Sequence, residues 1–191
     1  MLRALLLAPP GAGKGTQGDR LARRYGVPHI ATGDLLRDNV ARGTSVGLAA
    51  RTYIDAGDLV PDDVVVQLVL ERVEGPPLLD GFVLDGFPRT LEQAQRAHEW
   101  ASVHDRTFHA VVYLAVPTDE LVRRLLARGD AQGRSDDDAV TIHNRLDVYE
   151  AATAPLRDYY RDRGILVTVD GVGSVDDVAD RVVDALGAVV P

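Results

Sequence analysis

The chain has 191 residues, of which 46% are hydrophobic and 26% are charged, a balance that is typical of one folded domain and excludes a disordered or fibrous protein. The formal net charge of −8 excludes the broad basic surface that general binding to nucleic acid or to an anionic membrane requires. Because the chain has no cysteine, it has no disulfide, no thiolate metal site and no cysteine nucleophile.

The first predicted element is a buried strand over residues 2–8, an apolar run that ends at Pro9, Pro10 and Gly11. The run has no basic start and no cleavage-like site, and no stretch of the chain approaches the roughly eighteen apolar residues of a membrane span. We therefore expect one domain over residues 1–191, located in the cytoplasm.

A glycine-rich loop follows the strand. Its glycines allow backbone conformations that are closed to other residues, and they bring successive N–H groups close to a bound phosphate. Lys14, the only lysine of the chain, adds a compact charge that would reach the outer phosphates of a nucleotide. A helix is predicted over residues 14–25, and its N-terminus would attract the same anion. The glycines stand at Gly11, Gly13 and Gly15.

The loop departs from the usual phosphate-loop pattern at two positions. Ala8 replaces the first glycine, and Gly15 stands where a Ser or Thr that binds magnesium is usual. An ordinary glycine-rich turn between a strand and a helix is therefore the alternative interpretation of this segment.

The rest of the chain alternates between strand and helix patterns. Buried strands are predicted at residues 82–84, 110–115 and 165–169. Helices are predicted over residues 62–73, where Val64–Val66 would also suit a strand, and over 175–186, where Ser174 is the expected N-cap. Such alternation predicts a parallel sheet covered by helices.

Four segments, in their order and spacing, resemble adenylate kinases, which are nucleoside monophosphate kinases. They are residues 11–17 (GAGKGTQ), 32–37 (TGDLLR), 57–62 (GDLVPD) and 84–90 (LDGFPRT). The C-terminal half adds matches at residues 134–137 (RSDD), Arg145, Tyr149, 155–156 (PL) and 159–160 (YY). The resemblance therefore covers nearly the whole chain, and the stretch DGFPR is a specific signature of these kinases.

The resemblance implies an α/β fold of the P-loop NTPase type, with a parallel five-stranded sheet flanked by helices. It further implies a mobile NMP-binding insertion at residues 31–60 and a lid at residues 128–138. Because only five residues separate Arg128 from Arg134, the lid is of the short bacterial type, and no structural zinc is expected. The implied activity is reversible transfer of the terminal phosphoryl group of Mg-ATP to AMP, giving two ADP. A monomer is expected, with ATP and AMP as partners and with no nucleic acid or membrane.

Phosphoryl transfer between two nucleotides needs positioning and charge neutralisation more than a general base, because a monophosphate with a second pKa of about 6 is already ionised. Arginine suits this task, since its planar fork binds phosphate through two parallel hydrogen bonds. By resemblance, Arg37 and Arg89 would grip the AMP phosphate, Arg124 and Arg128 would attend the ATP phosphates, and Arg134 and Arg145 would close over the transferring group. The expected catalytic residues are Lys14, Arg89, Arg124, Arg128, Arg134 and Arg145.

The resemblance also assigns the nucleotide contacts. The ATP site would comprise Gly11, Ala12, Gly13, Lys14, Gly15, Thr16, Arg124, Arg128 and Gly173. The AMP site would comprise Thr32, Arg37, Asp58, Leu59, Val60, Gly86, Phe87, Pro88, Arg89, Gln93, Arg134 and Arg145. Thr32, where UMP/CMP kinases tend to have alanine, and Gln93, which would read the adenine edge, favour AMP as the acceptor. A hydrated Mg²⁺ is expected near Asp85 and Thr16.

Several alternatives stay open at this point. The chain could be a UMP/CMP kinase, although a kinase of a small metabolite such as shikimate would not need the paired arginines and the base-reading glutamine. A non-catalytic nucleotide-binding protein would be expected to lose its lid arginines, which are all present. Taken singly, each arginine could also be a solvated surface charge. Because Arg123 is adjacent to Arg124, the sequence does not decide which of the two points inward. Asp136 and Asp137 would either complement the dipole of the following helix or couple the lid to the site.

Overall fold

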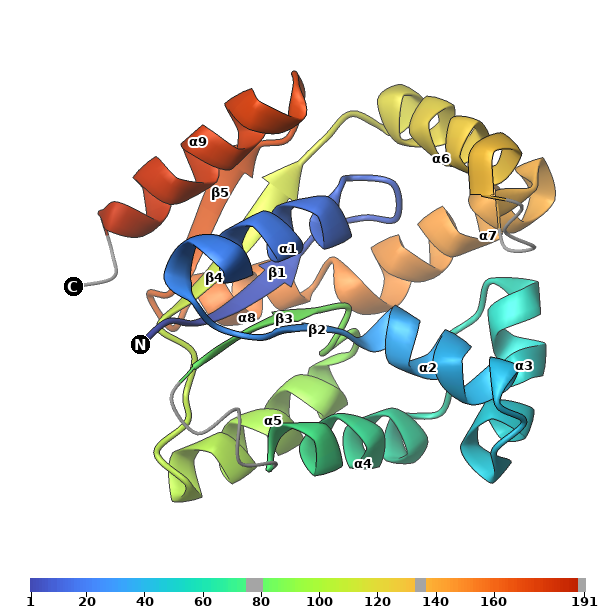
Figure 1. Cartoon of the computed structure of the whole chain (residues 1–191), viewed down its shortest axis with the longest axis horizontal. Coiled ribbons are helices and arrows are strands. Elements are labelled where there is room, and N and C mark those ends of the chain that lie inside the picture. Colours follow the sequence, from blue (N-terminus) through green and yellow to red (C-terminus); the bar gives the residue numbers. More distant parts are fainter. Residues whose placement is uncertain (75–80, 133–136, 189–191) are drawn as a thin grey trace.

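The computed structural model of the chain describes residues 1–74, 81–132 and 137–188, apart from the side chain of residue 132. Its centre is a five-stranded parallel sheet with the order β2-β3-β1-β4-β5, covered by helices on both faces (Figure 1). The strands are β1 (Arg3–Leu7), β2 (His29–Ala31), β3 (Phe82–Asp85), β4 (Ala110–Ala115) and β5 (Leu166–Asp170). The predicted fold class is confirmed.

Helices connect successive strands, as a parallel sheet requires. The first part of the chain holds α1 (Lys14–Tyr25), α2 (Thr32–Ala41), α3 (Ser45–Ala56), α4 (Asp62–Val73) and α5 (Leu91–Val103). The second part holds α6 (Thr118–Gln132), α7 (Ala139–Val148), a π-helical turn η3 (Tyr149–Thr153), α8 (Leu156–Arg161) and α9 (Val175–Gly187). No helix among the described residues is both long and apolar enough to cross a membrane.

The side chains of β1 point alternately to the two faces of the sheet and so contribute to two separate layers of the core. Leu5 and Leu7 face a cluster that includes apolar side chains of α4, α5 and α8, whereas Ala4 and Leu6 face a cluster built with α1 and α9. Successive strand side chains point to opposite faces, and each face of this sheet is covered, so the strands read as continuous apolar runs.

The predicted helices agree closely with the structure. The first helix spans the predicted residues 14–25 and ends at Gly26, which adopts the left-handed conformation with φ 64°. The segment at residues 62–73 is a helix, despite its run of valines. Ser174 caps α9 and forms a reciprocal capping box with Asp177.

The edge strand β2 is absent from the strands that the residue pattern predicted. It has only three residues, and Ile30 alone among them is fully buried, so it offers almost no periodic signal. Its pairing is nevertheless decisive for the site, because Ala31 lies opposite Asp85 in the sheet register. Thr32, the next residue, therefore begins α2 beside the end of β3.

Candidate active site

The loop between β1 and α1 is shaped for an anion. Gly11 and Gly13 have φ values of 85° and 95°, which glycine adopts without strain. Gly13 is the N-cap of α1 and has no side chain, so the N–H groups of the first helical turn face the space in front of the loop. A Cβ atom at Gly11 would lie 2.9 Å from the Leu121 carbonyl oxygen, so α6 packs directly against the loop.

The ammonium group of Lys14 is held inside this loop. Its Nζ atom donates hydrogen bonds to the carbonyl oxygens of Ala8, at 2.8 Å, and Pro9, at 3.0 Å. Burial lowers the pKa of Lys14 to about 8, against the opposing effect of the Asp85 carboxylate. The nearby guanidinium groups of Arg89, Arg145 and Arg128 contribute to this lowering of the pKa, so the site favours a polyanion.

Asp85 ends β3 directly opposite the start of α1. The carboxyl group is buried, and a Cβ atom at Gly15 would lie 3.7 Å from Asp85 Oδ2. Burial raises the pKa of Asp85, while the charges of Lys14 and His29 oppose that rise. Thr16, exposed on the first turn of α1, lines the same cavity as Asp85. The two predicted magnesium-site residues thus share one cavity.

Arg124, rather than Arg123, points toward the site. The Arg124 side chain is 23% exposed, whereas that of Arg123 is 69% exposed. Arg124 donates hydrogen bonds to Glu120, at 2.6 Å, and to the Gly171 carbonyl oxygen, at 3.1 Å. It lines the same cavity as Asp85 and Thr16, in agreement with the inward position expected for it.

Asp137 joins two arginines from different helices. Its fully buried carboxylate accepts hydrogen bonds from Arg128, at 2.6 and 2.7 Å, and from Arg145, at 2.6 Å. Although burial alone would raise the pKa of Asp137, these two guanidinium groups hold it below its usual range. The N-cap of α7 is instead Asp138, which accepts hydrogen bonds from the N–H groups of Val140 and Thr141. The coupling interpretation of Asp137 is therefore the one that the geometry supports.

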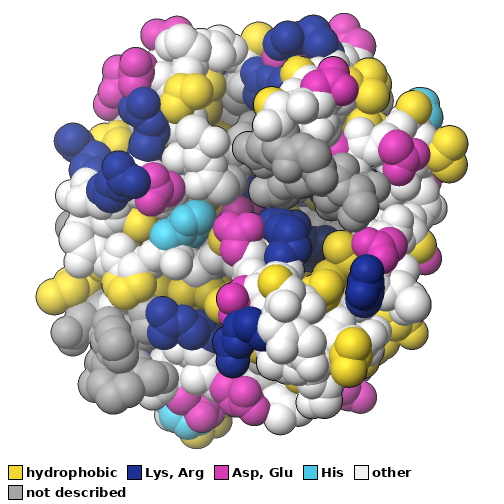
Figure 2. Space-filling model, turned by 45° about the vertical axis from the view of Figure 1, so that its right-hand side comes forward, with side chains coloured by type: hydrophobic (Ala, Val, Ile, Leu, Met, Phe, Trp, Pro, Cys, Tyr) yellow, Lys and Arg dark blue, Asp and Glu magenta, His cyan; other side chains and the backbone are white. Residues whose placement is uncertain are grey.

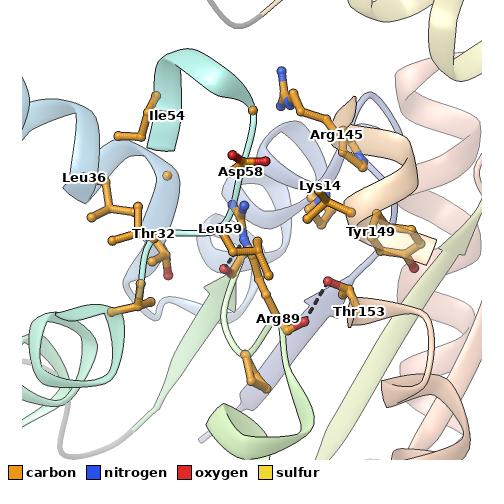
Figure 3. Close-up of a pocket in the computed structure, with 18 of the residues that line it drawn as sticks. Lys14, Thr32, Leu36, Ile54, Asp58, Leu59, Arg89, Arg145, Tyr149 and Thr153 are labelled. Atoms are coloured by element: carbon orange, nitrogen blue, oxygen red, sulfur yellow. Dashed lines mark hydrogen bonds between the residues drawn. The ribbon is translucent and has the colours of Figure 1, made fainter. Parts of the chain in front are cut away.

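Arg89 is fixed by its main chain and by its guanidinium group. Its N–H group donates to Gln93 Oε1 at 2.7 Å, and its Nε atom donates to the Gly86 carbonyl oxygen at 2.8 Å. Thr153, on the π-helical turn η3, donates its hydroxyl hydrogen to the Arg89 carbonyl oxygen at 2.8 Å (Figure 3). The guanidinium group therefore has a defined position, and Arg89 lines two adjoining cavities.

The smaller cavity, of about 130 Å³, lies between α2 and α3 on one side and α7 with η3 on the other (Figure 3). The buried Thr32 hydroxyl on its wall has no hydrogen-bond partner among the described residues. Gln93 also lines this cavity, but its amide nitrogen already donates to Asp62 at 2.6 Å. One N–H of that amide remains for a ligand. Asp58, Leu59 and Val60, which follow α3, line the cavity as well.

The larger cavity, of about 1100 Å³, runs along the phosphate loop toward Arg124 and Arg128. Figure 2 shows basic side chains inside the central hollow of one face, next to acidic ones. The two cavities meet, because seven residues line both of them. The shared residues are Pro10, Lys14, Gly33, Arg37, Gly86, Arg89 and Arg145. Four of the shared side chains are cationic, so positive charge is concentrated where the two cavities join.

Some expected contact residues lie elsewhere. Phe87 and Ala12 are buried in the hydrophobic core, so only their main chains are available to a ligand. Gly173, with φ 129°, follows β5 and lies outside the described lining of both cavities. Arg134 and Asp136, together with part of the expected lid, fall outside the described residues.

Two residues of the site were not foreseen from the sequence. Asp62 accepts hydrogen bonds from Gln93 and Thr90, and Thr153 holds the Arg89 main chain. Asp62 lies in one of the segments that carry the resemblance, which is a usable signal. Thr153 acts across 64 residues of sequence and from a π-helical turn, so neither spacing nor periodicity indicates it.

Comparison with known proteins agrees with this geometry. The sequence model of the family described as Adenylate kinase matches residues 6–165. The adenylate kinase of Mycolicibacterium paratuberculosis is 50% identical over 186 residues, which cover 97% of this chain and 99% of that protein. That of Nocardia farcinica is 49% identical with the same coverage, and that of Leptospira biflexa is 45% identical and is covered completely.

Proposed function

Because the chain belongs to the adenylate kinase family and reversibly transfers the terminal phosphoryl group of ATP to AMP to give two ADP, we propose that its larger cavity holds ATP and its smaller cavity holds AMP. The observation that carries this assignment is the junction of the cavities. Lys14, Arg89 and Arg145 line both of them, so two phosphates bound one in each cavity would meet beside these three cations.

The chemistry required at the junction is charge neutralisation. The AMP phosphate is already ionised at neutral pH, because its second pKa is about 6, so the attacking oxygen needs no base. The loop amides and Lys14 hold the outer phosphates of ATP, while Arg37 and Arg89 hold the AMP phosphate. Guanidinium groups fixed before substrate arrives stabilise the transferring group without reorganisation. The anchored main chain of Arg89 supports this role.

The lid side of the site acts through Arg124, Arg128, Arg134 and Arg145. Asp137 ties Arg128 to Arg145, so a single carboxylate sets the separation of two cations that face the transferring phosphoryl group. For Arg134 the proposal rests on the family resemblance, by which it closes over the transferring phosphoryl group. We further propose that the lid, residues 128–138, and the NMP-binding segment, residues 31–60, close over the nucleotides and exclude water, because open access would permit hydrolysis of ATP.

The residues present fit a hydrated magnesium ion. The Asp85 carboxylate and the Thr16 hydroxyl line the phosphate cavity, and both are oxygen donors of the kind that Mg²⁺ prefers. Because Mg²⁺ retains several waters and binds phosphate oxygens, two protein oxygens are sufficient to orient it. When bound, the ion would neutralise charge on the ATP phosphates.

AMP is the acceptor that the smaller cavity suits. The Thr32 hydroxyl, which has no partner in the described part of the chain, and the remaining N–H of Gln93 offer polar contacts to a purine edge, and the main chain at Asp58, Leu59 and Val60 flanks it. A UMP/CMP kinase is the less favoured alternative. The proposal extends to a cytoplasmic monomer on the family resemblance alone, and light scattering of the purified protein tests the monomer.

The decisive experiment measures ADP formation by the purified protein with ATP, magnesium and, in turn, AMP, CMP, UMP or GMP. We expect AMP to be the preferred acceptor. The matched variant Arg89→Ala should lose on the order of a hundredfold in turnover, as other preorganised electrostatic contacts do. Wild-type turnover in Arg89→Ala would contradict the acceptor-site assignment.

A further inference from the structure

A pair of hydrogen bonds joins α7 to the segment that ends α3. The amide nitrogen of Asn144 donates to the Ala56 carbonyl oxygen at 2.9 Å and to Asp58 Oδ1 at 2.8 Å. Ala56 is the last residue of α3, and its carbonyl is one of those that an α-helix leaves without an internal partner. Asn144 thus caps the C-terminal end of α3 from a helix more than eighty residues away.

The two helices are in direct contact beside this pair. Gly57, the C-cap of α3, has φ 78° and presents no side chain to α7. A Cβ atom at this position would lie 2.8 Å from Arg145 Cγ and 2.9 Å from Thr141 Cγ2. The end of α3 therefore seats on α7 through backbone, and the Asn144 amide closes the edge of that contact.

The contact borders the cavity that we assign to AMP. Asp58 follows α3 and Arg145 lies on α7, and both line this cavity from different sides (Figure 3). The helices α2 and α3 pack on each other, and α3 also contacts α7. Whatever holds α3 on α7 therefore holds the wall of the cavity in place.

We propose that Asn144 is a positioning residue for the acceptor. Its two hydrogen bonds, to Ala56 and Asp58, form a clasp that holds the segment of α2 and α3 against α7 and so stabilises the conformation in which AMP is enclosed. The inference rests on the proposed assignment of the smaller cavity to AMP. The Asn144 amide suits this place because its NH2 group has two N–H donors, one for a carbonyl oxygen and one for a carboxylate, and an ionised acidic side chain has none. A carboxylate at residue 144 would instead face Asp58 and the Ala56 carbonyl, and repel both.

Three variants test the clasp by steady-state kinetics. Asn144→Ala should raise the KM for AMP about three- to tenfold, the effect of losing roughly one net hydrogen bond, while the KM for ATP stays unchanged. Asn144→Asp should raise the KM for AMP further, and added salt should reduce that increase. Combining Asp58→Asn with Asn144→Asp restores one amide–carboxylate pair, so the KM for AMP should fall part of the way back.

His143→Ala is the matched control, because His143 is exposed on the same helix. It should leave both KM values within about twofold of wild type, as surface substitutions do. Equal changes in the two KM values for Asn144→Ala, or no change in either, would overturn the proposal. So would a double variant no better than Asn144→Asp alone.

Hydrogen exchange without nucleotide separates the clasp from the AMP assignment. Asn144→Ala should increase amide exchange in residues 45–56 relative to wild type and to His143→Ala, because the end of α3 opens more often. Faster exchange with an unchanged KM for AMP would locate the acceptor elsewhere and refute the cavity assignment. Unchanged exchange in all variants would refute the clasp itself.

Discussion

Asp137 accepts two hydrogen bonds from Arg128, at 2.6 and 2.7 Å, although its side chain is completely buried. A buried carboxylate is costly unless it is paired, and here the pairing continues to Arg145 at 2.6 Å. The same three charges thus stabilise the fold and place two cations beside the cavity that we propose for the ATP phosphates.

The first prediction concerns Asp137→Asn, which keeps the shape and removes the charge. We expect the free energy of unfolding to fall by about 2–3 kcal/mol and turnover to fall at least about tenfold, because two cations lose their shared anion. Denaturant unfolding and initial rates measure the two effects. Asp147→Asn, an exposed acidic position on α7, is the control and should change neither.

The stability effect of Asp137 should depend on pH with a defined sign. Because the folded-state pKa is below its unfolded value, the stabilising contribution is complete above the unfolded pKa of about 4 and is lost as the pH falls through the folded value. The difference in unfolding free energy between wild type and Asp137→Asn should therefore be largest near neutral pH and shrink in acid. A difference that grows in acid would contradict the ion-pair account.

A second prediction concerns the charge of Lys14. Its pKa of about 8 means that the ammonium loses its proton just above neutral pH in the absence of nucleotide. Bound phosphates favour the charged form, so ATP binding takes up a proton, and the affinity should weaken by up to about tenfold per pH unit above 8. Calorimetric titration with ATP between pH 7.5 and 9.5 measures this slope. In Lys14→Met the slope should be flatter, and equal slopes would remove Lys14 from the phosphate site.

The sequence predicted those parts of the fold that depend on local signals. The first helix ends just before Gly26, because glycine there adopts φ 64°, and the last helix begins just after Ser174, because its hydroxyl caps the first turn. The strand at residues 29–31 was not predicted, because three residues are too few to show an alternation of apolar and polar side chains. Its position is set by its pairing with β3.

The site was harder to predict where distant segments meet. The roles of Asp137 and Asp138 depend on where Arg128 and Arg145 arrive, and nothing in three consecutive aspartates separates a helix cap from a bridge between arginines. The contact of Thr153 with the Arg89 main chain likewise depends on tertiary structure.

The adjacent arginines on α6 provide a third prediction with its own control. Arg124→Ala should raise the KM for ATP about tenfold, because the guanidinium group lines the larger cavity, which we propose for ATP, and also donates to the Gly171 carbonyl oxygen. Arg123→Ala removes the same charge from the exposed neighbouring position and should change the KM for ATP less than about twofold. Reversed effects would mean that Arg123 is the ligand.

Thr32 provides a fourth prediction, on acceptor choice. If its buried hydroxyl binds the acceptor base, Thr32→Ala should raise the KM for AMP about tenfold and narrow the preference for AMP over CMP and UMP. Thr32→Ser keeps the hydroxyl and should keep the preference. If the hydroxyl does not bind the acceptor base, it is only a buried polar group without a partner among the described residues. Thr32→Ala would then stabilise the protein and leave the kinetics unchanged, which would contradict the prediction.

The last prediction tests whether the π-helical turn positions Arg89. Thr153→Val keeps the volume of a buried side chain but leaves the Arg89 carbonyl oxygen without this donor, so the guanidinium group loses part of its support. We expect kcat/KM for AMP to fall about tenfold while the KM for ATP stays unchanged. Thr153→Ser retains the donor and should recover most of the activity, whereas a merely packing role would make the serine variant the worse of the two, since it lacks the methyl group. Initial rates at varied AMP and fixed saturating ATP separate these outcomes.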